Sequence, residues 1–281
     1  MNVAAIQMVS SVNTAANLTA ARQLLSQAAA QGAELAVLPE YFCLMGLKDT
    51  DKLAIAEPDG DGPLQTFLRQ CSVDFNLWVV GGTIPICAAA AAARAGSVYN
   101  STLVFNPQGE QVARYDKIHL FRFDNGRESY DESRVLQAGQ QPVAFDLLSR
   151  DGCRWRIGLS ICYDLRFAEL YRALACDVLL VPSAFTYTTG QAHWELLLRA
   201  RAIENLAYVV ASAQGGLHDS GRRTWGQSIV VGPWGDVLAQ IPPVLSQLGS
   251  PDGPGLVVAE LSKAKLTALR QQLPALDHRV L

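Results

Sequence analysis

The sequence predicts an α/β fold in which helices cover layered sheets, as one domain over residues 1–281. Short apolar runs of strand length alternate with Ala- and Leu-rich segments of helical spacing, which is the pattern of strand–helix units. Glycine-containing turns also join strand-like runs, which indicates hairpins. The chain is 49% hydrophobic and 17% charged, so a large core is available and global disorder is excluded. No internal repeat or linker divides the sequence.

The amino-terminal half combines short apolar strands with two helices. The expected elements, in chain order, are a strand at residues 3–8, a helix at 13–30, a strand at 35–38, a helix at 64–72, and strands at 77–84, 101–105 and 111–115. Gly32 ends the first helix, as glycine commonly does. The pair Gly81-Gly82 permits close approach of a backbone or ligand. The alanine-rich residues 87–96 lie between two strand-like runs and are predicted as a hairpin tip, and residues 121–139 as an irregular loop over a site.

The carboxyl-terminal half repeats the alternation. Its expected elements are a strand at 157–161, a helix from 162 to about 174, a strand at 178–181, a helix at 193–205, a strand at 207–211, hairpin strands at 228–231 and 236–239, a strand at 256–261 and a last helix. Pro182 is expected to end the strand before it. Ser262 is expected to cap the last helix, which stops near Pro274, and residues 242–255 form a Pro- and Gly-rich loop.

Charge and composition exclude several classes of function. The net charge of −3 argues against nucleic acid as a partner, because phosphate binding relies on clustered Lys and Arg. We expect no membrane association, because no segment has the roughly 20 apolar residues that span a bilayer and none is basic and amphipathic. The start of the chain has no basic region typical of a signal peptide. Six scattered cysteines without a Cys-x-x-Cys pair indicate neither disulfides nor zinc, so a cytoplasmic location is expected.

Three polar residues follow strand-like runs, where ligands of parallel sheets bind. Glu40 follows the strand at 35–38, Lys117 follows the strand at 111–115, and Cys162 follows the run at 157–161. Separately, each has a simpler interpretation: a solvated loop charge, half of a surface ion pair, and a small buried hydrophobe. Together they supply a base, a cation for an oxyanion and a nucleophile, which acyl transfer requires.

Several sequence blocks resemble the nitrilase superfamily, the carbon–nitrogen hydrolases. The three signature blocks are Leu38-Pro39-Glu40, Tyr115 to Phe121, and Ser160 to Phe167. Shorter phrases that also resemble the family are Gly81 to Pro85, Tyr99-Asn100-Ser101, Ala192-His193-Trp194 and Gly232 to Gly235. The resemblance covers nearly the whole chain, and several blocks in the same order are far more specific than one. It implies a four-layer α-β-β-α sandwich.

The resemblance implies a role for each of the three residues. Glu40 takes the thiol proton, and Cys162 adds to an amide carbonyl. Lys117 and the backbone N–H of Tyr163 hold the oxyanion, and Glu40 then protonates the departing ammonia and activates water against the thioester. The family also carries a second glutamate, for which Glu132 is preferred and Glu128 remains an alternative. No metal ion or organic cofactor is expected.

The residues after Cys162 resemble the branch of ω-amidases and of amidases acting on deaminated glutathione. Arg166 can clamp a substrate carboxylate, or can be a structural partner of Asp164 or Glu169. Tyr187, Thr188 and Thr189 can offer hydroxyls to a polar acyl chain, or can cap a helix. His193 is expected to be structural. The expected substrate is deaminated glutathione, then α-ketoglutaramate or α-ketosuccinamate. Nitrile hydrolysis and N-carbamoyl amino acid hydrolysis are less favoured.

Other classes of protein are less consistent with these residues. A binding or assembly module on the same scaffold would not need Glu40, Lys117 and Cys162. A serine hydrolase would need a Gly-x-Ser-x-Gly elbow, and a thiol redox enzyme would need a second, resolving cysteine nearby. The resemblance further implies a homodimer or higher homo-oligomer, paired through helices that include residues 166–174, with apolar Phe167, Leu170 and Leu174.

Overall fold

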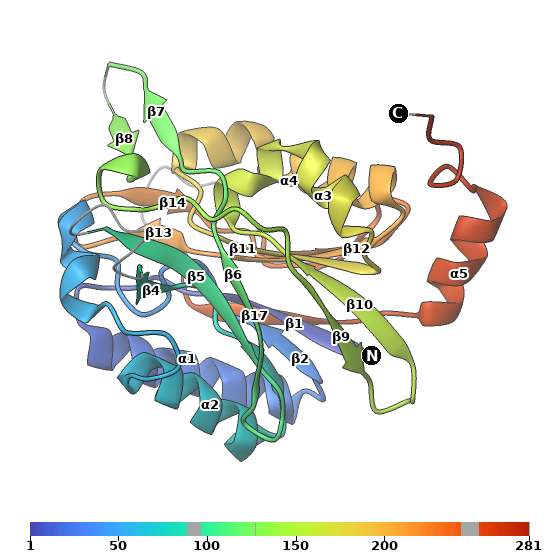
Figure 1. Ribbon diagram of the computed structural model, residues 1–281, viewed down its shortest axis with the longest axis horizontal. Helices are drawn as coiled ribbons and strands as arrows, with labels where there is room; N and C mark the ends of the chain where they lie inside the picture. The colour runs from blue at the N-terminus through green and yellow to red at the C-terminus, as the bar shows by residue number, and fades with distance from the viewer. Residues whose placement is uncertain (89–96, 127, 243–252, 281) are drawn as a thin grey trace.

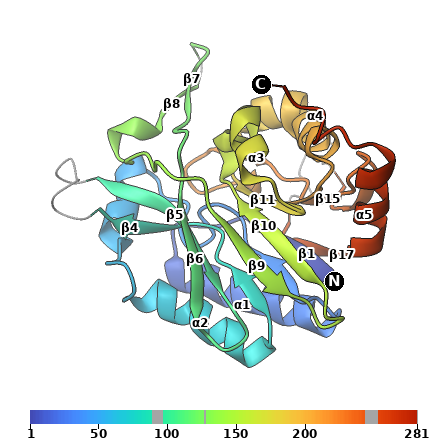
Figure 2. The same cartoon turned by 45° about the vertical axis from the view of Figure 1, so that its right-hand side comes forward.

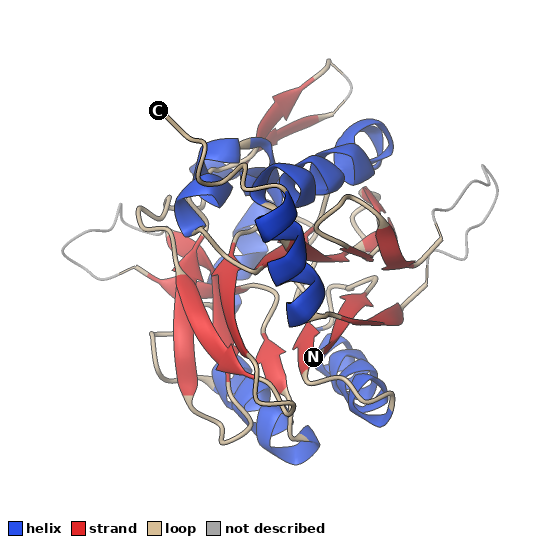
Figure 3. Ribbon diagram, turned by 90° about the vertical axis from the view of Figure 1, so that its right-hand side faces the viewer, coloured by secondary structure: helices blue, strands red, loops and turns tan. Residues whose placement is uncertain are grey.

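Two β-sheets stack face to face in the middle of the molecule, and helices cover both outer faces (Figures 1 and 3). The computed structural model describes residues 1–88, 97–126, 128–242 and 253–280. The order of layers is helix, sheet, sheet, helix. The α/β class and the four-layer sandwich predicted from the sequence are therefore confirmed.

The first sheet contains seven strands within the described residues. Their order is β17 (Gly255–Glu260), β1 (Asn2–Gln7), β2 (Leu35–Val37), β3 (Trp78–Val80), β5 (Val98–Phe105) and β4 (Ile84–Cys87), and β6 (Gln111–Asp116) also pairs with β5. Strands β1, β2 and β3 are parallel. Helices α1 (Thr14–Ala30) and α2 (Pro63–Phe75) lie against the outer face, where Leu25 and Leu68 are fully buried.

The second sheet contains six strands within the described residues. Their order is β16 (Val237–Gln240), β15 (Ile229–Val231), β12 (Tyr208–Ala213), β11 (Val178–Ser183), β10 (Arg154–Leu159) and β9 (Ala144–Leu148). Strands β10, β11 and β12 are parallel, and β15 and β16 form the hairpin expected around Gly232 to Gly235. Helices α3 (Ala168–Leu174) and α4 (Tyr187–Asn205) cover the outer face of this sheet (Figure 1).

The main core fills the space between the two sheets and under α3 and α4. Trp155, Tyr208 and Tyr115 are among its largest fully buried side chains. Burying side chains of this size contributes on the order of 2 kcal/mol each, so this core fixes the stacking of the sheets. Leu170 and Leu174 of α3 also point into this core, not outward as a subunit contact would require.

Shorter elements surround the ends of the strands. They are the 3-10 turns η1 (Asp49–Ile55), η2 (Glu132–Arg134) and η3 (Cys162–Arg166), the hairpin of β7 (Arg122–Asp124) and β8 (Ser129–Asp131), and the pair β13 (Gly215–Leu217) and β14 (Arg223–Trp225). The β7–β8 hairpin projects from the body of the molecule (Figures 1 and 2). Helix α5 (Lys263–Gln272) has Ser262 as its N-cap, as expected. The Oγ of Ser262 accepts a hydrogen bond from the Lys265 N–H.

The single strand predicted at 77–84 is wrong, because the chain breaks at Gly81 and Gly82. Strand β3 ends at Val80, and β4 begins at Ile84. Gly82 has a φ of +48°, and a Cβ there would lie 2.1 Å from the backbone oxygen of Pro39. The close approach expected of this pair therefore occurs, and the neighbour is the backbone that precedes Glu40.

Three element boundaries also differ from the prediction. The helix expected at 193–205 begins at Tyr187, because Thr186 caps it and Gly190 permits tight packing against Trp225. The helix expected directly after Cys162 is a 3-10 turn, and α3 starts only at Ala168. Pro182 does not end β11, which continues to Ser183 and stays paired with β12. Pairing with β10 stops at Leu180, so the N–H that proline lacks is not needed on that side.

The predicted irregular loop at 121–139 contains the β7–β8 hairpin, and the prediction missed strands β9, β13 and β14. Most of the alanine-rich tip at 87–96 and of the loop at 242–255 lies outside the described residues. Within the part of the chain that the structure describes, every helix is too short or too polar to cross a membrane.

Candidate active site

Side chains from the carboxyl ends of strands in both sheets converge on one site. Glu40 lies three residues after β2, and Lys117 directly follows β6, both from the first sheet. Cys162 lies three residues after β10 of the second sheet. Glu40 and Cys162 line one pocket, and Lys117 acts electrostatically on Cys162. The stacking of the two sheets thus brings together residues that are 77 and 45 positions apart in the sequence.

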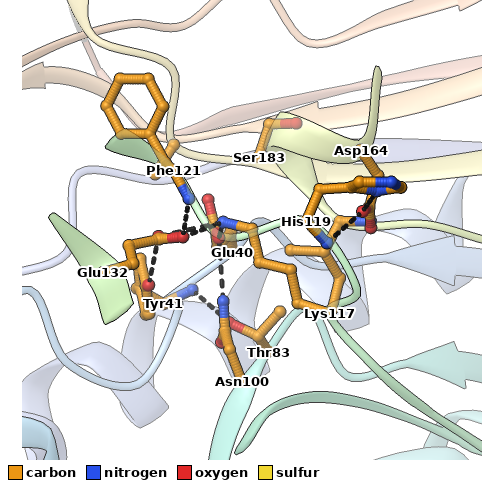
Figure 4. A network of polar contacts seen from close by, with 12 residues as sticks. Glu40, Tyr41, Thr83, Asn100, Lys117, His119, Phe121, Glu132, Asp164 and Ser183 are labelled. Atoms are coloured by element: carbon orange, nitrogen blue, oxygen red, sulfur yellow. Dashed lines mark hydrogen bonds and ion pairs between the residues drawn. The ribbon is translucent and has the colours of Figure 1, made fainter. Parts of the chain in front are cut away.

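The Lys117 ammonium group lies between two carboxylates (Figure 4). Its Nζ is 2.9 Å from Oε1 of Glu40 and 2.8 Å from Oε2 of Glu132. Lys117 and Glu40 are almost completely buried, and the Glu132 side chain is 14% exposed. A buried cation with two hydrogen-bonded carboxylates is held rigidly, because losing either contact would leave a charge uncompensated.

Neutral groups donate further hydrogen bonds to both carboxylates (Figure 4). Asn100 Nδ2 donates to Oε1 of Glu40 at 2.9 Å. The Tyr41 hydroxyl donates to Oε1 of Glu132 at 3.0 Å, and the Phe121 N–H donates to its Oε2 at 2.7 Å. Glu40 thus receives both contacts on Oε1, and its Oε2 accepts none from the residues that the structure describes. Glu132 is bound through both of its oxygens.

The backbone at two of these positions adopts an uncommon conformation. Tyr41 has a φ of +57° and Cys162 a φ of +49°, in the left-handed region that residues with side chains rarely occupy. Each such residue costs on the order of 1–3 kcal/mol and is retained only where the surroundings enforce it. At Tyr41, the Thr83 hydroxyl accepts a hydrogen bond from the backbone N–H at 2.9 Å.

At Cys162, the buried carboxylate of Asp164 holds the turn. Its oxygens accept hydrogen bonds from the Ile161 N–H at 2.8 Å, the Tyr115 hydroxyl at 2.7 Å and the His119 N–H at 3.0 Å. Tyr115 and His119 flank Lys117 in the sequence. Asp164 therefore connects the Cys162 turn to the segment that carries Lys117.

The charges around the site perturb the pKa values of three groups. Burial alone would lower the pKa of Lys117, but the carboxylates of Glu132 and Glu40 outweigh it and raise the pKa. Burial raises the pKa of Glu132, but the nearby Lys117 outweighs it, so the net pKa is lowered. Burial and the Glu40 carboxylate raise the pKa of the Cys162 thiol well above its usual range, against the effect of Lys117. The resting site therefore holds an ammonium, a carboxylate and a neutral thiol.

The pocket over Cys162 is small, with a cavity volume of about 20 Å³. It is lined by Glu40, Phe121, Glu132, Cys162, Tyr163, Arg166, Ala184, Phe185, Thr186, Thr189 and Arg222. We call it the inner pocket. Arg166 lies over the rings of Tyr163 and Phe185 and contacts Nδ1 of His193 at 3.2 Å. Its guanidinium is therefore in the pocket wall, whereas Asp164, one of its two proposed structural partners, serves the Cys162 turn.

A larger cavity of about 480 Å³ adjoins the inner pocket and shares Arg222 with it. Its lining residues are Tyr41, Leu44, Met45, Gly46, Leu47, Lys48, Asp49, Lys52, Glu128, Ser129, Tyr130, Ser220, Gly221 and Arg222. We call it the outer cavity. Tyr41 forms part of the partition, because its hydroxyl is bound to Glu132 of the inner pocket.

The site residues expected from the sequence lie in three places. Glu40, Lys117, Cys162, Glu132, Tyr163 and Arg166 lie together at or beside the inner pocket. Glu128 instead lines the outer cavity, where the Thr188 hydroxyl donates to it at 3.3 Å. Tyr187 packs against Trp225 and the Arg223 guanidinium, outside both linings. Of the two glutamates considered, Glu132 is the one in contact with Lys117.

Other polar residues of the site had no role in the sequence analysis. Asn100 belongs to a phrase that resembles the family, so a signal for it was present. Thr83 lies within the recognised phrase Gly81 to Pro85, and Tyr41 directly follows Glu40, but their hydrogen bonds depend on the tertiary fold. Arg222 lies in a loop between two short strands, and no local pattern indicated that it would reach the inner pocket.

Comparison with known proteins identifies the class. Residues 2–271 match the model of the carbon–nitrogen hydrolase family, and the chain belongs to this family. It is thus a hydrolase of carbon–nitrogen bonds other than peptide bonds, as predicted. The chain is 40% identical to a deaminated glutathione amidase of Synechocystis over 99% of this chain and 97% of that protein. It is 37% identical to the human omega-amidase NIT2, over 97% and 92% of the two chains.

The fold matches solved structures of the same superfamily. The crystal structure of Saccharomyces cerevisiae Nit3, a member of branch 10 of the nitrilase superfamily, superposes with a TM-score of 0.83. The two chains are 28% identical, and the match covers 100% of this chain and 97% of Nit3. The resemblance to the nitrilase superfamily predicted from the sequence blocks is confirmed.

Proposed function

We propose that this chain is a thiol amidohydrolase that cleaves the amide of a small, carboxylate-bearing substrate through a thioester at Cys162. The observation that carries the proposal is the Lys117 ammonium held between the buried carboxylates of Glu40 and Glu132, beside the pocket that contains the Cys162 thiol. These are the base, the electrophilic cation and the nucleophile of covalent amide hydrolysis.

In the first half of the reaction, Glu40 accepts the proton of the Cys162 thiol. Its Oε2 is the oxygen that is free to do so, because Asn100 and Lys117 both bind Oε1. The sulfur then bonds to the amide carbon, and the carbonyl electron pair moves to oxygen. The Lys117 ammonium and the Tyr163 N–H stabilise this oxyanion. When the C–N bond breaks, Glu40 returns its proton to the departing nitrogen.

In the second half, water hydrolyses the thioester. Glu40, again a carboxylate, takes a proton from water as its oxygen attacks the acyl carbon. The C–S bond then breaks, and the proton on Glu40 returns to sulfur, which restores the neutral thiol. Because burial raises the pKa of Cys162, the thiol needs this base in each cycle rather than ionising spontaneously. Glu132 keeps Lys117 charged and in place.

The proposed substrate is deaminated glutathione, with α-ketoglutaramate or α-ketosuccinamate as the alternative. The names of these relatives support both substrates, since the chain is 40% identical to the deaminated glutathione amidase and 37% identical to the omega-amidase. Arg166 is positioned in the pocket wall to bind the carboxylate of the keto acid. A hydrolase of N-carbamoyl amino acids remains the weaker alternative.

The leaving group differs between these substrates. The amide nitrogen of α-ketoglutaramate leaves as ammonia, as expected in the sequence analysis. In deaminated glutathione the corresponding amide joins the five-carbon keto acid to cysteinylglycine, so the group that leaves is this dipeptide. Both reactions form α-ketoglutarate, which makes α-ketoglutarate the product to measure.

The remaining expectations concern the state of the protein. We propose a homodimer, as the family resemblance implies, and the exposed apolar side chains Leu196 and Ile203 on α4 offer a surface for it. We further propose that residues 1–281 form one domain and act in the cytoplasm. Sedimentation that gave only monomer would contradict the dimer.

The decisive test replaces the nucleophile. Cys162→Ala is expected to form no α-ketoglutarate from either substrate, whereas Cys87→Ala, at an exposed cysteine, retains activity. Because Glu40 accepts the thiol proton, iodoacetamide is expected to label Cys162 faster than the exposed Cys87 and to inactivate the enzyme in parallel. If Cys162→Ala kept its activity, the mechanism would be wrong, and a wild-type protein that hydrolysed none of the amides would favour a binding module.

A further inference from the structure

The Arg222 guanidinium lies at the border between the inner pocket and the outer cavity, and it lines both. Its Nη2 donates to the backbone oxygen of Ala184 at 2.8 Å. The guanidinium also lies over the Tyr130 ring, 5.1 Å from its centroid. Its Nε is buried and has no hydrogen-bond partner among the residues that the structure describes. The arginine is thus fixed in position with part of its donor set unused.

An unused guanidinium donor indicates the kind of ligand that is missing. A buried N–H without a protein partner costs free energy, and in native structures such a group is completed by an ordered water, an ion or a ligand. The planar fork of arginine matches a carboxylate, which can accept two parallel hydrogen bonds. The contacts that fix Arg222 are a carbonyl oxygen and an aromatic ring, so its positive charge is not neutralised by either.

The mechanism indicates which part of the substrate reaches Arg222. Glu40 protonates the leaving nitrogen, so the leaving group must lie on the Glu40 side of the inner pocket. The segment that directly follows Glu40 builds much of the outer cavity, from Tyr41 to Lys52. A leaving group larger than ammonia therefore extends into the outer cavity, past Arg222.

We infer that Arg222 binds the terminal carboxylate of a dipeptide leaving group in the outer cavity. This inference rests on the proposed function and assigns the two arginines to opposite ends of the substrate. Arg166 lines the inner pocket but not the outer cavity, and it binds the acyl end of the substrate. Arg222 serves the amine end, and so favours amides whose leaving group carries a carboxylate over primary amides.

The other charges of the outer cavity are consistent with an anionic ligand. Lys48, Lys52 and Arg222 are its cations, and Asp49 and Glu128 are its carboxylates. The Lys52 ammonium lies 4.6 Å from the centroid of the Tyr41 ring. Burial lowers the pKa of Lys52, the carboxylates of Glu132 and Asp49 oppose this, and the nearby Arg222 charge acts in the same direction as burial. An anion bound between these two cations would relieve their mutual repulsion.

The test compares three substrates that share one acyl group. They are deaminated glutathione, the same molecule with its terminal carboxylate converted to a carboxamide, and α-ketoglutaramate. The measured quantity is the ratio of kcat/KM for the acid to that for the carboxamide, which cancels any general effect of a variant on catalysis. For the wild type, a ratio of about 10 to 100 is expected, because a charge-assisted hydrogen bond distinguishes the two.

Arg222→Gln is expected to reduce this ratio to about 1, and Arg222→Lys to an intermediate value, because lysine keeps the charge and loses the fork. Arg223→Gln is the matched control, since Arg223 is the adjacent arginine and lies outside both linings. It is expected to retain the wild-type ratio.

Two outcomes would overturn the inference and are distinguishable from failure of the proposed function. A wild-type ratio near 1, or an Arg222→Gln variant that keeps the wild-type ratio, would remove the carboxylate subsite alone, provided that wild type still hydrolyses α-ketoglutaramate. If wild type hydrolysed none of the three amides, the proposed function itself would be wrong and the inference would fall with it.

Discussion

The inner pocket and the outer cavity differ in how their positively charged side chains are paired. In the inner pocket, the Lys117 cation is fully engaged by Glu40 and Glu132, and both carboxylates have further hydrogen bonds. In the outer cavity, Arg222 retains a buried donor without a described partner, and Lys52 faces an aromatic ring. The Lys117 cation is already paired with carboxylates without substrate, whereas Arg222 has a donor left for a substrate group.

This difference separates the work of catalysis from that of recognition. Groups that stabilise a transition state act best when they are already oriented, because no reorganisation is then needed during the reaction. Groups that select a substrate contribute affinity only through contacts that the free protein does not already make. Variants of the Glu40, Lys117 and Glu132 cluster should therefore change kcat and stability, and variants of the outer cavity should change KM.

The largest effect is expected for Lys117→Met. It removes the oxyanion cation and leaves two carboxylates buried side by side, so kcat/KM is expected to fall roughly 10³-fold. The free energy of unfolding is expected to fall by about 3–5 kcal/mol, because a buried pair has lost one partner. Steady-state kinetics and urea unfolding measure the two quantities.

The double variant Lys117→Met/Glu132→Gln serves as its control. Removing one of the carboxylates relieves their repulsion, so stability should partly recover while activity stays lost. If the single variant were as stable as wild type, the buried charge cluster would contribute little to stability, and the proposed difference between the two regions would be wrong.

A smaller effect is expected for Glu132→Gln, a decrease of about 10²-fold in kcat, because Lys117 keeps Glu40 but loses its second charged partner.

The same variant also tests how the stability of the folded protein depends on pH in the acid range. Lys117 lowers the pKa of Glu132 in the folded protein, so the unfolded chain binds its proton first as the pH falls. Wild type therefore loses stability below about pH 4.3, the ordinary glutamate pKa.

Glu132→Gln removes this contribution, and its unfolding free energy should depend less steeply on pH below that point, by at most about 1.4 kcal/mol per pH unit. Urea unfolding between pH 3 and 6 (roughly the accessible range) measures both slopes. Equal slopes for the two proteins would mean that Glu132 titrates normally and is not held by Lys117.

Gly82→Ala is expected to lower stability by about 1–3 kcal/mol, because the added methyl group meets the backbone oxygen of Pro39. The Glu40 segment would have to move, so kcat should fall as well. Gly60→Ala is the matched control: Gly60 also has a positive φ, +86°, but its Cβ would meet open space. Equal losses in the two variants would assign the effect to backbone strain alone.

The smallest effect is expected for Lys52→Met in the outer cavity. KM for deaminated glutathione should rise about threefold, since partly exposed charge pairs contribute less than about 1 kcal/mol, and kcat should stay close to wild type. Lys265→Met on α5, an exposed lysine remote from both cavities, is the control. A change in kcat instead of KM would break the division between the two regions.

The two regions also differ in how far the sequence foretold them. Glu40, Lys117 and Cys162 follow strand ends within recognisable blocks, and parallel strands place such ends at one edge of a sheet. The outer cavity has no comparable signal. Arg222 comes from the loop between β13 and β14, and Tyr41 to Lys52 come from the segment between β2 and β3, so their proximity depends on the tertiary fold.

The sequence by itself determined the α/β layers, the family and the residue types available for chemistry, because periodicity and short motifs are local properties of the chain. Only the tertiary structure decided that Glu132, not Glu128, contacts Lys117, that α4 begins at Tyr187, and that Arg222 joins two cavities. These features arise from contacts between segments far apart in the chain, which form only when the core between the sheets is packed.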